Sequence, residues 1–197
     1  MNKQINQVEG ESIQEVIKMP TRRASAYSKK YARPYTRKSK VKSQNYIKTI
    51  PQQKVVKFNM GNIEAFKQGR YKFILKLISK EKVQARDNAI EAARQVVHKD
   101  LEDNLPGAYY FSIKKYPHHI VRENRVYSGG SKGERVNTGM QMSFGVAIGR
   151  AAFIDKGDII FLVAFTEKKS IPMARYALEK IKPKLPCATK IVMEVRE

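Results

Sequence analysis

The placement of positive charge constrains this chain more than any other feature of its sequence. Residues 16–63 contain thirteen Lys and Arg residues and no Asp or Glu, and the whole chain carries a formal net charge of +21. Self-repulsion on this scale opposes a compact state, and residues 16–63 also lack the apolar periodicity of a core element. We therefore expect a polyanionic partner, for which nucleic acid and an anionic membrane surface are the two candidates.

Other features of the sequence favour nucleic acid over a membrane. No apolar stretch approaches the roughly 20 residues of a membrane-spanning helix, and residues 1–10 lack the apolar segment of a secretory signal. The helical segments carry mixed charge, unlike a basic amphipathic membrane helix. Cys187 is the single cysteine, which excludes an intrachain disulfide and a cysteine-based zinc site. We expect a cytoplasmic protein.

Charge divides the chain into three parts. Residues 1–18 form an extension with no legible role, residues 19–63 form a basic arm, and residues 64–197 form the folded domain. A disordered cationic tail would explain the arm's charge, but tyrosines stand among its cations, and aromatic faces can stack on bases. We therefore predict an arm that becomes ordered on RNA. Its candidate RNA-binding residues are Arg22, Arg23, Lys29, Lys30, Arg33, Tyr35, Arg37, Lys38, Lys40 and Lys42.

The folded domain has the pattern of an α+β protein. Alternating or continuous apolar runs predict strands at 71–78, 109–113, 158–165 and 188–195, and the run at 158–165 is typical of a central strand buried on both faces. Helical spacing predicts one helix at 85–101 and a second that begins at Ser170 as N-cap and stops before Pro183. This order predicts a two-layer sandwich, with both helices on one face of a mainly antiparallel sheet.

The densest polar cluster of the domain lies at residues 114–125. A zinc site needs about three or four ligands, and the only histidine besides His118 and His119 is His98, within the first predicted helix. No partner for a catalytic base can be recognised, so we expect no metal, no cofactor and no enzymatic activity. We predict that one histidine of the pair is buried and hydrogen-bonded while the other faces out. The candidates for RNA contact here are Lys115, His118, His119, Arg122 and Arg125.

A glycine-rich loop follows at 128–143. It is not a nucleotide-binding P-loop, because Lys132 precedes Gly133 and no helical pattern comes after it. A flexible basic loop close to an RNA backbone is the favoured interpretation, and an ordinary surface loop is the alternative. Met142 or Phe144 is expected to be structural.

Several motifs, taken together, resemble one family. They include residues 116–124 (YPHHIVREN), 138–140 (TGM) and 143–145 (SFG). Segments in the same order as in that family precede them at 34–37, 50–51, 60–62 and 91–94. The combination, over roughly residues 19–195, resembles the archaeal and eukaryotic ribosomal L-ten-e family, the counterpart of bacterial L-sixteen.

This resemblance implies an α+β sandwich that binds large-subunit ribosomal RNA near the aminoacyl-tRNA site and catalyses nothing. It implies as partners ribosomal RNA, aminoacyl-site tRNA and neighbouring ribosomal proteins. The family's internal loop, which points toward the peptidyl-transferase centre, corresponds to about residues 127–142. The loop residues carried over are Glu134, Arg135, Thr138, Gly139 and Met140, and Lys132 is a further candidate of the loop. This loop is one residue longer than usual, and Gln141 replaces an arginine. An RNA-modifying or RNA-processing enzyme, or a general nucleic-acid-binding protein, is the alternative.

Overall fold

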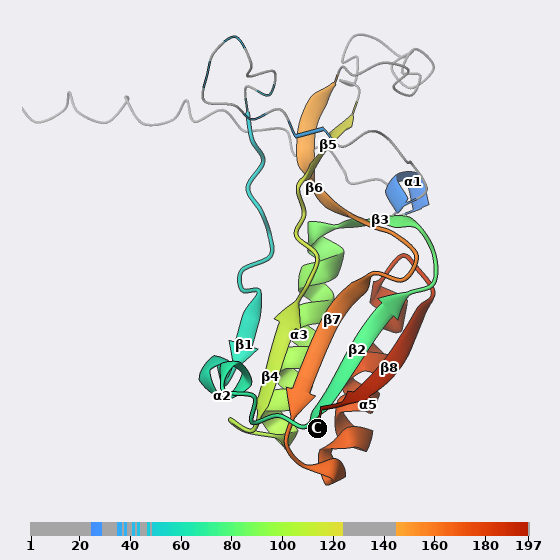
Figure 1. The fold of residues 1–197 in the computed structure, drawn as a ribbon. Coiled ribbons are helices and arrows are strands. Elements are labelled where there is room, and N and C mark those ends of the chain that lie inside the picture. Colours follow the sequence, from blue (N-terminus) through green and yellow to red (C-terminus); the bar gives the residue numbers. More distant parts are fainter. Residues whose placement is uncertain are drawn as a thin grey trace, which may run out of the picture.

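A five-stranded antiparallel sheet organises the domain (Figure 1). The computed structural model describes residues 25–28, 35, 36, 38, 41, 43, 47, 49–123 and 145–196. The strand order is β1-β4-β7-β2-β8. The bounds are β1 Asn59–Gly61, β4 Tyr109–Ile113, β7 Ile159–Phe165, β2 Phe73–Ser79 and β8 Thr189–Val195. The middle strand, β7, is buried along nearly its whole length, which confirms the central strand predicted from its continuous apolar run.

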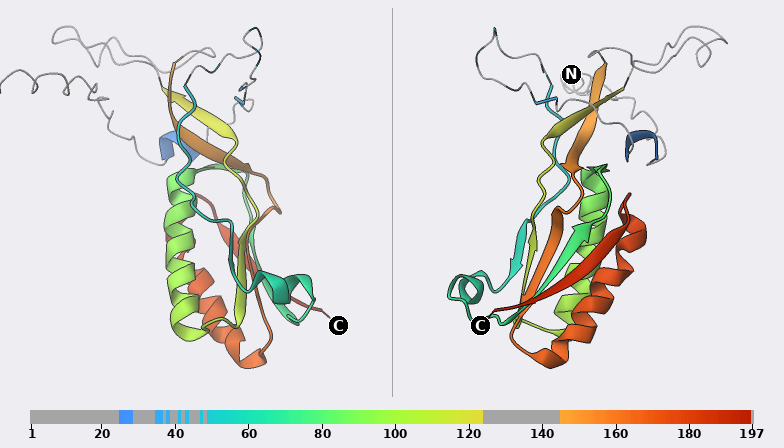
Figure 2. Two further views of the ribbon diagram at one scale, coloured as in Figure 1. Left: turned by 90° about the vertical axis from the view of Figure 1, so that its left-hand side faces the viewer. Right: turned by 45° about the vertical axis from the view of Figure 1, so that its right-hand side comes forward.

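Two long helices cover one face of this sheet (Figure 2). Helix α3 spans Asp87–Asn104, and helix α5 spans Ile171–Lys180. Helix α3 turns Ile90, Ala93, Val97 and Leu101 inward, a spacing of three or four residues that places them on one side of a helix. The two-layer α+β sandwich predicted from the sequence is confirmed.

The ends of the helices correct two details of the prediction. Residues 85 and 86 belong to strand β3 (Val83–Arg86), so the first helix starts later than its apolar spacing indicated. Ser170 stands at the N-cap of α5 as predicted, but its side chain makes no capping hydrogen bond. A 3-10 turn, η2 (Lys168–Ser170), precedes α5, and another, η3 (Lys182–Lys184), follows it and contains Pro183.

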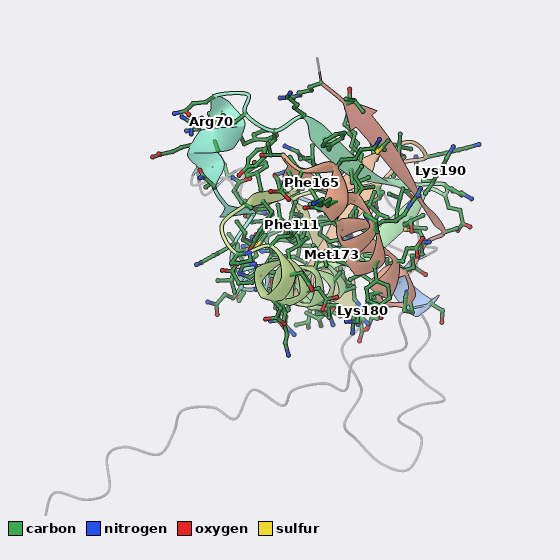
Figure 3. All side chains as sticks on the ribbon, turned by 90° about the horizontal axis from the view of Figure 1, so that it is seen from below. Arg70, Phe111, Phe165, Met173, Lys180 and Lys190 are labelled. Atoms are coloured by element: carbon green, nitrogen blue, oxygen red, sulfur yellow. The ribbon has the colours of Figure 1, made fainter. Side chains whose placement is uncertain are left out.

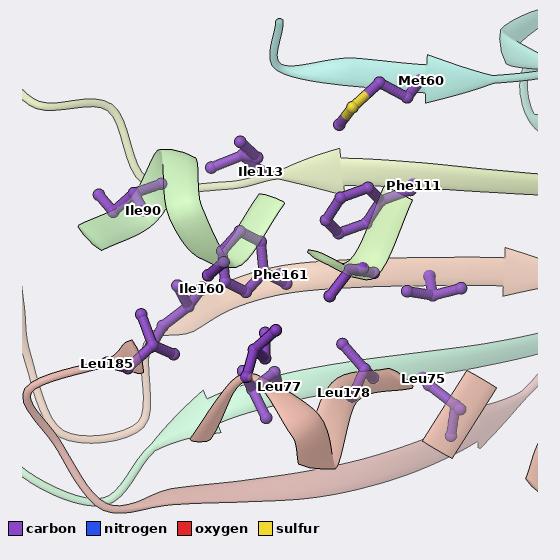
Figure 4. Packing of buried hydrophobic residues seen from close by; sticks show 14 of the residues in the cluster. Met60, Leu75, Leu77, Ile90, Phe111, Ile113, Ile160, Phe161, Leu178 and Leu185 are labelled. Carbon is purple, nitrogen blue, oxygen red and sulfur yellow. The ribbon is translucent and has the colours of Figure 1, made fainter. Parts of the chain in front are cut away.

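The core lies between the sheet and the two helices (Figure 4). Phe111 on β4 and Phe161 on β7 are completely buried, with ring centroids 5.6 Å apart. Leu77 on β2 and Leu178 on α5 are also fully buried. Full burial of one such side chain contributes about 1.5–3 kcal/mol, so this layer supplies much of the stability. Val55 and Met60, which the sequence assigned to the arm, are part of the same core.

A short helix packs on the opposite face of the sheet. Helix α2 (Ile63–Lys67) begins at Asn62, whose side-chain oxygen accepts a hydrogen bond from the Ala65 amide at 2.9 Å. Its Phe66 stacks on Tyr110 of β4 with ring centroids 4.1 Å apart. Gly61, the last residue of β1 before this helix, has φ +79°, and a β carbon there would collide with the Tyr109 carbonyl oxygen. The sequence did not predict α2 or β1.

A second, three-stranded sheet extends beyond the main layer (Figure 1). Its order is β3-β6-β5, with β6 at Val146–Ile154 and β5 at His119–Glu123. Helix α1 (Ser25–Ser28), a single turn from the arm, lies beside β3. The sequence predicted none of these strands, because β5 lies in a polar cluster and β6 is rich in small residues. No helix in the described ranges is long and apolar enough to cross a membrane.

Candidate nucleic-acid interface

Tyr35 joins the basic arm to the small sheet. Its backbone N–H donates a hydrogen bond to His119 Nδ1 at 2.9 Å, and its carbonyl accepts one from the Ile120 N–H at 3.1 Å. The Arg122 guanidinium lies over its ring, with Cζ 3.5 Å from the centroid. Three predicted site residues, Tyr35, His119 and Arg122, are thus in one cluster. Tyr35 is used to hold the arm against strand β5.

The two adjacent histidines have different environments, as predicted. His119 is 6% exposed and its ring centroid lies 4.8 Å from that of Phe153, whereas His118 is exposed. Burial, and then the positive charge of Arg122, lowers the pKa of His119 to about 4. The ring is therefore neutral at pH 7, and because Nδ1 accepts a hydrogen bond, we assign its proton to Nε2. His119 fastens the arm through a neutral acceptor.

Tyr27 provides a second attachment of the arm. Its hydroxyl donates a hydrogen bond to the Glu123 carboxylate, and Arg86 Cζ lies 4.7 Å from its ring centroid. The residue is 6% exposed and packs with Val121 and Ala151 of the small sheet. We expected the arm's tyrosines to offer their faces to RNA bases, but the face of Tyr27 is occupied within the chain.

The root of the arm is held by helix α3. The Lys54 N–H donates a hydrogen bond to Asp87 at 3.1 Å, and the Val56 N–H donates one to Glu91 at 3.4 Å. Glu91 forms a buried ion pair with Arg94, whose Nη2 lies 2.6 Å from Oε1. Burial alone would raise the pKa of Glu91, but the hydrogen bond and charge of Arg94 outweigh it, and the pKa is lowered. This carboxylate stays ionised and anchors the backbone of the arm.

Positive side chains gather where the arm meets the small sheet. Arg150 of β6 donates a hydrogen bond to the Pro51 carbonyl at 2.8 Å. Burial, and then the charge of Arg150, lowers the pKa of Lys38. Arg122 Nη1 is buried and has no hydrogen-bond partner in the described part of the chain. These cations around the docked arm favour an anionic ligand.

Other predicted site residues have different surroundings. Lys115 forms an ion pair with Asp158, which compensates its charge. The third histidine, His98, is far from the histidine pair in sequence. Its Nδ1 lies 2.9 Å from the Tyr109 hydroxyl, within the folded domain. The remaining candidates lie outside the described residues: Arg22, Arg23, Lys29, Lys30, Arg33, Arg37, Lys40, Lys42, Arg125, Lys132, Glu134, Arg135, Thr138, Gly139 and Met140.

The sequence reasoning missed Arg86 and Arg150. Each is a cation beside small or apolar residues of a strand in the three-stranded sheet, and each contacts the arm or its tyrosine. Arg150 had a recognisable signal, because it is the one charged residue within residues 146–154, which are otherwise small or apolar. A lone cation in such a strand indicates a polar partner from another segment.

Comparison with known proteins gives the family. The family model described as ribosomal protein L16p/L10e matches residues 31–192, a range that includes Tyr35, both long helices and nearly all of both sheets. The chain belongs to this family. A uL16 protein of the large ribosomal subunit from Pyrobaculum neutrophilum is 35% identical over 179 residues, covering 90% of this chain and 94% of the relative.

Two further archaeal relatives carry the same name, large ribosomal subunit protein uL16. The protein of Sulfolobus acidocaldarius is 39% identical over 176 residues, or 88% of this chain and 93% of its own length. That of Nanoarchaeum equitans is 39% identical over 154 residues, or 78% of this chain and 82% of its own length. The resemblance to the family, inferred from the motifs, is confirmed, and the L16p/L10e match includes Tyr35, His119 and Arg122.

Proposed function

We propose that this L16p/L10e protein is a constituent of the large ribosomal subunit, ribosome-bound in the cytoplasm, that binds ribosomal RNA without catalysing a reaction. Its membership of the family and the names of its archaeal relatives support this proposal. The proposed mode of binding is supported by one observation: a highly cationic arm is attached to the small sheet through Tyr35, His119 and Arg122. The attachment gives the arm's charges a defined origin on a rigid scaffold.

The binding mechanism follows from this arrangement. Lys and Arg side chains neutralise phosphates and release counterions, which supplies affinity without reading sequence. An arm held at Tyr27, Tyr35 and Pro51 loses less conformational entropy on binding than a free tail would. In this proposal His119 acts indirectly, by positioning Tyr35, while Lys38, Arg122 and Arg150 contact phosphates.

Salt dependence of ribosomal RNA binding tests the role of the arm. The slope of log K against log salt is roughly −0.7 to −0.9 per phosphate contact, and a variant with five arm cations replaced should flatten it by several units. The replaced residues are Arg33, Arg37, Lys38, Lys40 and Lys42, each changed to Gln.

A second variant that removes the same charge elsewhere provides the control. This variant changes five exposed lysines to Gln: Lys67, Lys72, Lys168, Lys169 and Lys190. The first four lie near the end of the domain opposite the small sheet, and Lys190 lies on β8, an edge strand of the five-stranded sheet. Figure 3 views the domain from that end and labels Lys190 on strand β8. We expect a smaller change of slope in this variant. Equal slopes for both variants would mean that net charge alone, and not the arm, determines binding.

We further propose that residues 127–142 act at the aminoacyl-tRNA site, as the family resemblance implies. Trimming residues 128–141 should leave the fold intact, because changing loop length alters the free energy of unfolding only slightly. Reconstituted subunits with the trimmed protein should then assemble but bind tRNA poorly. Normal tRNA binding at full protein occupancy would remove this assignment, and lost occupancy would make the loop part of the docking surface.

A further inference from the structure

Three exposed or half-exposed rings form an array beside the docked arm. Phe58 stacks on Tyr116 with ring centroids 5.2 Å apart and an interplanar angle of 25°. The Tyr116 centroid lies 4.5 Å from that of His118. Tyr116 is 40% exposed and His118 is exposed, so the array extends from the partly buried Phe58 to the surface. We call Phe58, Tyr116 and His118 the ring array.

The backbone around the array holds these rings in place. The Ile113 N–H donates a hydrogen bond to the Phe58 carbonyl at 2.8 Å, and the His118 N–H donates one to the Tyr116 carbonyl at 2.9 Å. Arg150 Nη1 lies 3.4 Å from the Tyr116 hydroxyl. Pro117, between Tyr116 and His118 in the sequence, is buried. Rings held in this way lose little further side-chain entropy when a ligand stacks on them.

The charges around the array favour a nucleic acid over an apolar partner. Lys57 precedes Phe58 and Lys114 lies two residues before Tyr116; both are exposed, and neither forms an ion pair with any described residue. Arg150, against the Tyr116 hydroxyl, adds a third positive charge. An aromatic surface flanked by cations is the combination that binds unpaired nucleotides, with the base stacked on a ring and the phosphates near Lys or Arg.

We infer that the ring array binds an unpaired RNA base. This inference rests on the proposed function and adds to it a base contact distinct from the phosphate contacts of the arm. Tyr116, which belongs to no other described hydrophobic cluster of the fold, is thereby assigned to the RNA interface. His118 has a stacking role, while its buried neighbour His119 holds the arm.

The full-length protein and a short single-stranded oligoadenylate test the inference. Tyr116→Ala should weaken binding of the single strand by about tenfold, the loss typical of one base–aromatic contact, with an unchanged salt slope because no phosphate contact is removed. Binding of a fully paired RNA duplex should stay unchanged. Tyr116→Phe keeps the ring and should bind the single strand like the parent protein.

Tyr176→Ala is a matched control. Tyr176 on helix α5 is 63% exposed and, like Tyr116, lies beside a cation, with Lys180 Nζ 5.5 Å from its ring centroid. Removing it should leave single-strand binding unchanged. Thermal unfolding of each variant shows whether the fold is retained, and the comparison uses variants that unfold within a few degrees of the parent.

Three results would overturn the inference. Parental single-strand affinity in Tyr116→Ala would exclude a base contact, and the arm variant with its five glutamines would still report separately on the proposed function. Equal losses in Tyr116→Ala and Tyr116→Phe would assign the effect to the hydroxyl and Arg150. Unchanged RNA affinity combined with loss of a neighbouring ribosomal protein during assembly would assign the array to a protein contact.

Discussion

Removing the buried partner of Glu91 tests how the arm is anchored. Glu91 and Arg94 are 8% and 9% exposed, and Arg94 forms two hydrogen bonds to the carboxylate, at 2.6 and 2.8 Å. Arg94→Met keeps the aliphatic bulk but leaves a buried carboxylate bonded only to the Val56 amide and Gln95. Breaking a buried pair in this way costs about 3–5 kcal/mol. We expect the lower end, about 3 kcal/mol, because both groups retain slight exposure.

Urea denaturation at pH 7 measures this loss directly. A loss of about 3 kcal/mol corresponds to a Tm lower by about 6–12 °C in a chain of this size. A double variant, Glu91→Gln with Arg94→Met, removes the unpaired charge and should recover most of the stability. A loss under about 1 kcal/mol in Arg94→Met, or no recovery in the double variant, would refute the view that a buried charge pair anchors the arm.

The same pair predicts a pH dependence. In the parent protein the pKa of Glu91 is lowered, so the stability that it contributes is present above its unfolded pKa and is lost as pH falls through the folded value. In Arg94→Met the unpaired, buried carboxylate has a raised pKa, and protonation relieves the unfavourable charge. The stability difference between parent and variant should therefore shrink as the pH falls toward 4.

Two further predictions concern single positions. The pKa of His119 in the folded protein, about 4, lies below its unfolded value of about 6.5. The stability that His119 contributes is therefore full above pH 6.5 and falls toward pH 4 by up to about 1.4 kcal/mol per pH unit. His119→Gln should flatten this part of a urea-denaturation pH profile, and an unchanged profile would contradict the buried neutral ring. Gly61→Ala should destabilise the domain by about 1–3 kcal/mol or more in the same assay, because φ is +79° and the new β carbon would collide with the Tyr109 carbonyl oxygen. Gly149→Ala is the control and should change stability little, because nothing lies within 4 Å of a β carbon there. Similar losses in the two variants would contradict this account.

The elements that the sequence predicted correctly are those with strong local patterns. The continuous apolar run of β7 and the three-to-four spacing of α3 identify their structure without any tertiary information. Strand β4 was predicted with the bounds that it has, and β8 within one residue. Strand β1 has three residues, too few to show a period.

The small sheet could not be predicted because its burial comes from distant segments. Strand β5 has a polar sequence, yet His119 is buried and accepts a hydrogen bond from an arm residue 84 positions away in sequence. A similarly long separation in sequence hides the pairing of Tyr35 with Arg122. Sequence reasoning identified these as site residues and separated the two histidines correctly, but it assigned the arm's tyrosines to RNA. The structure shows that Tyr27 and Tyr35 bind arginines of their own chain.

Retention on ribosomal subunits tests the central proposal most directly. A tagged chain is expressed in cells, and large subunits are isolated on gradients and washed with increasing salt. We predict that the parent chain stays with the large subunit through a high-salt wash, and that the variant with five arm cations replaced by Gln is released at lower salt. A parent chain found at the top of the gradient, or with the small subunit, would contradict the account.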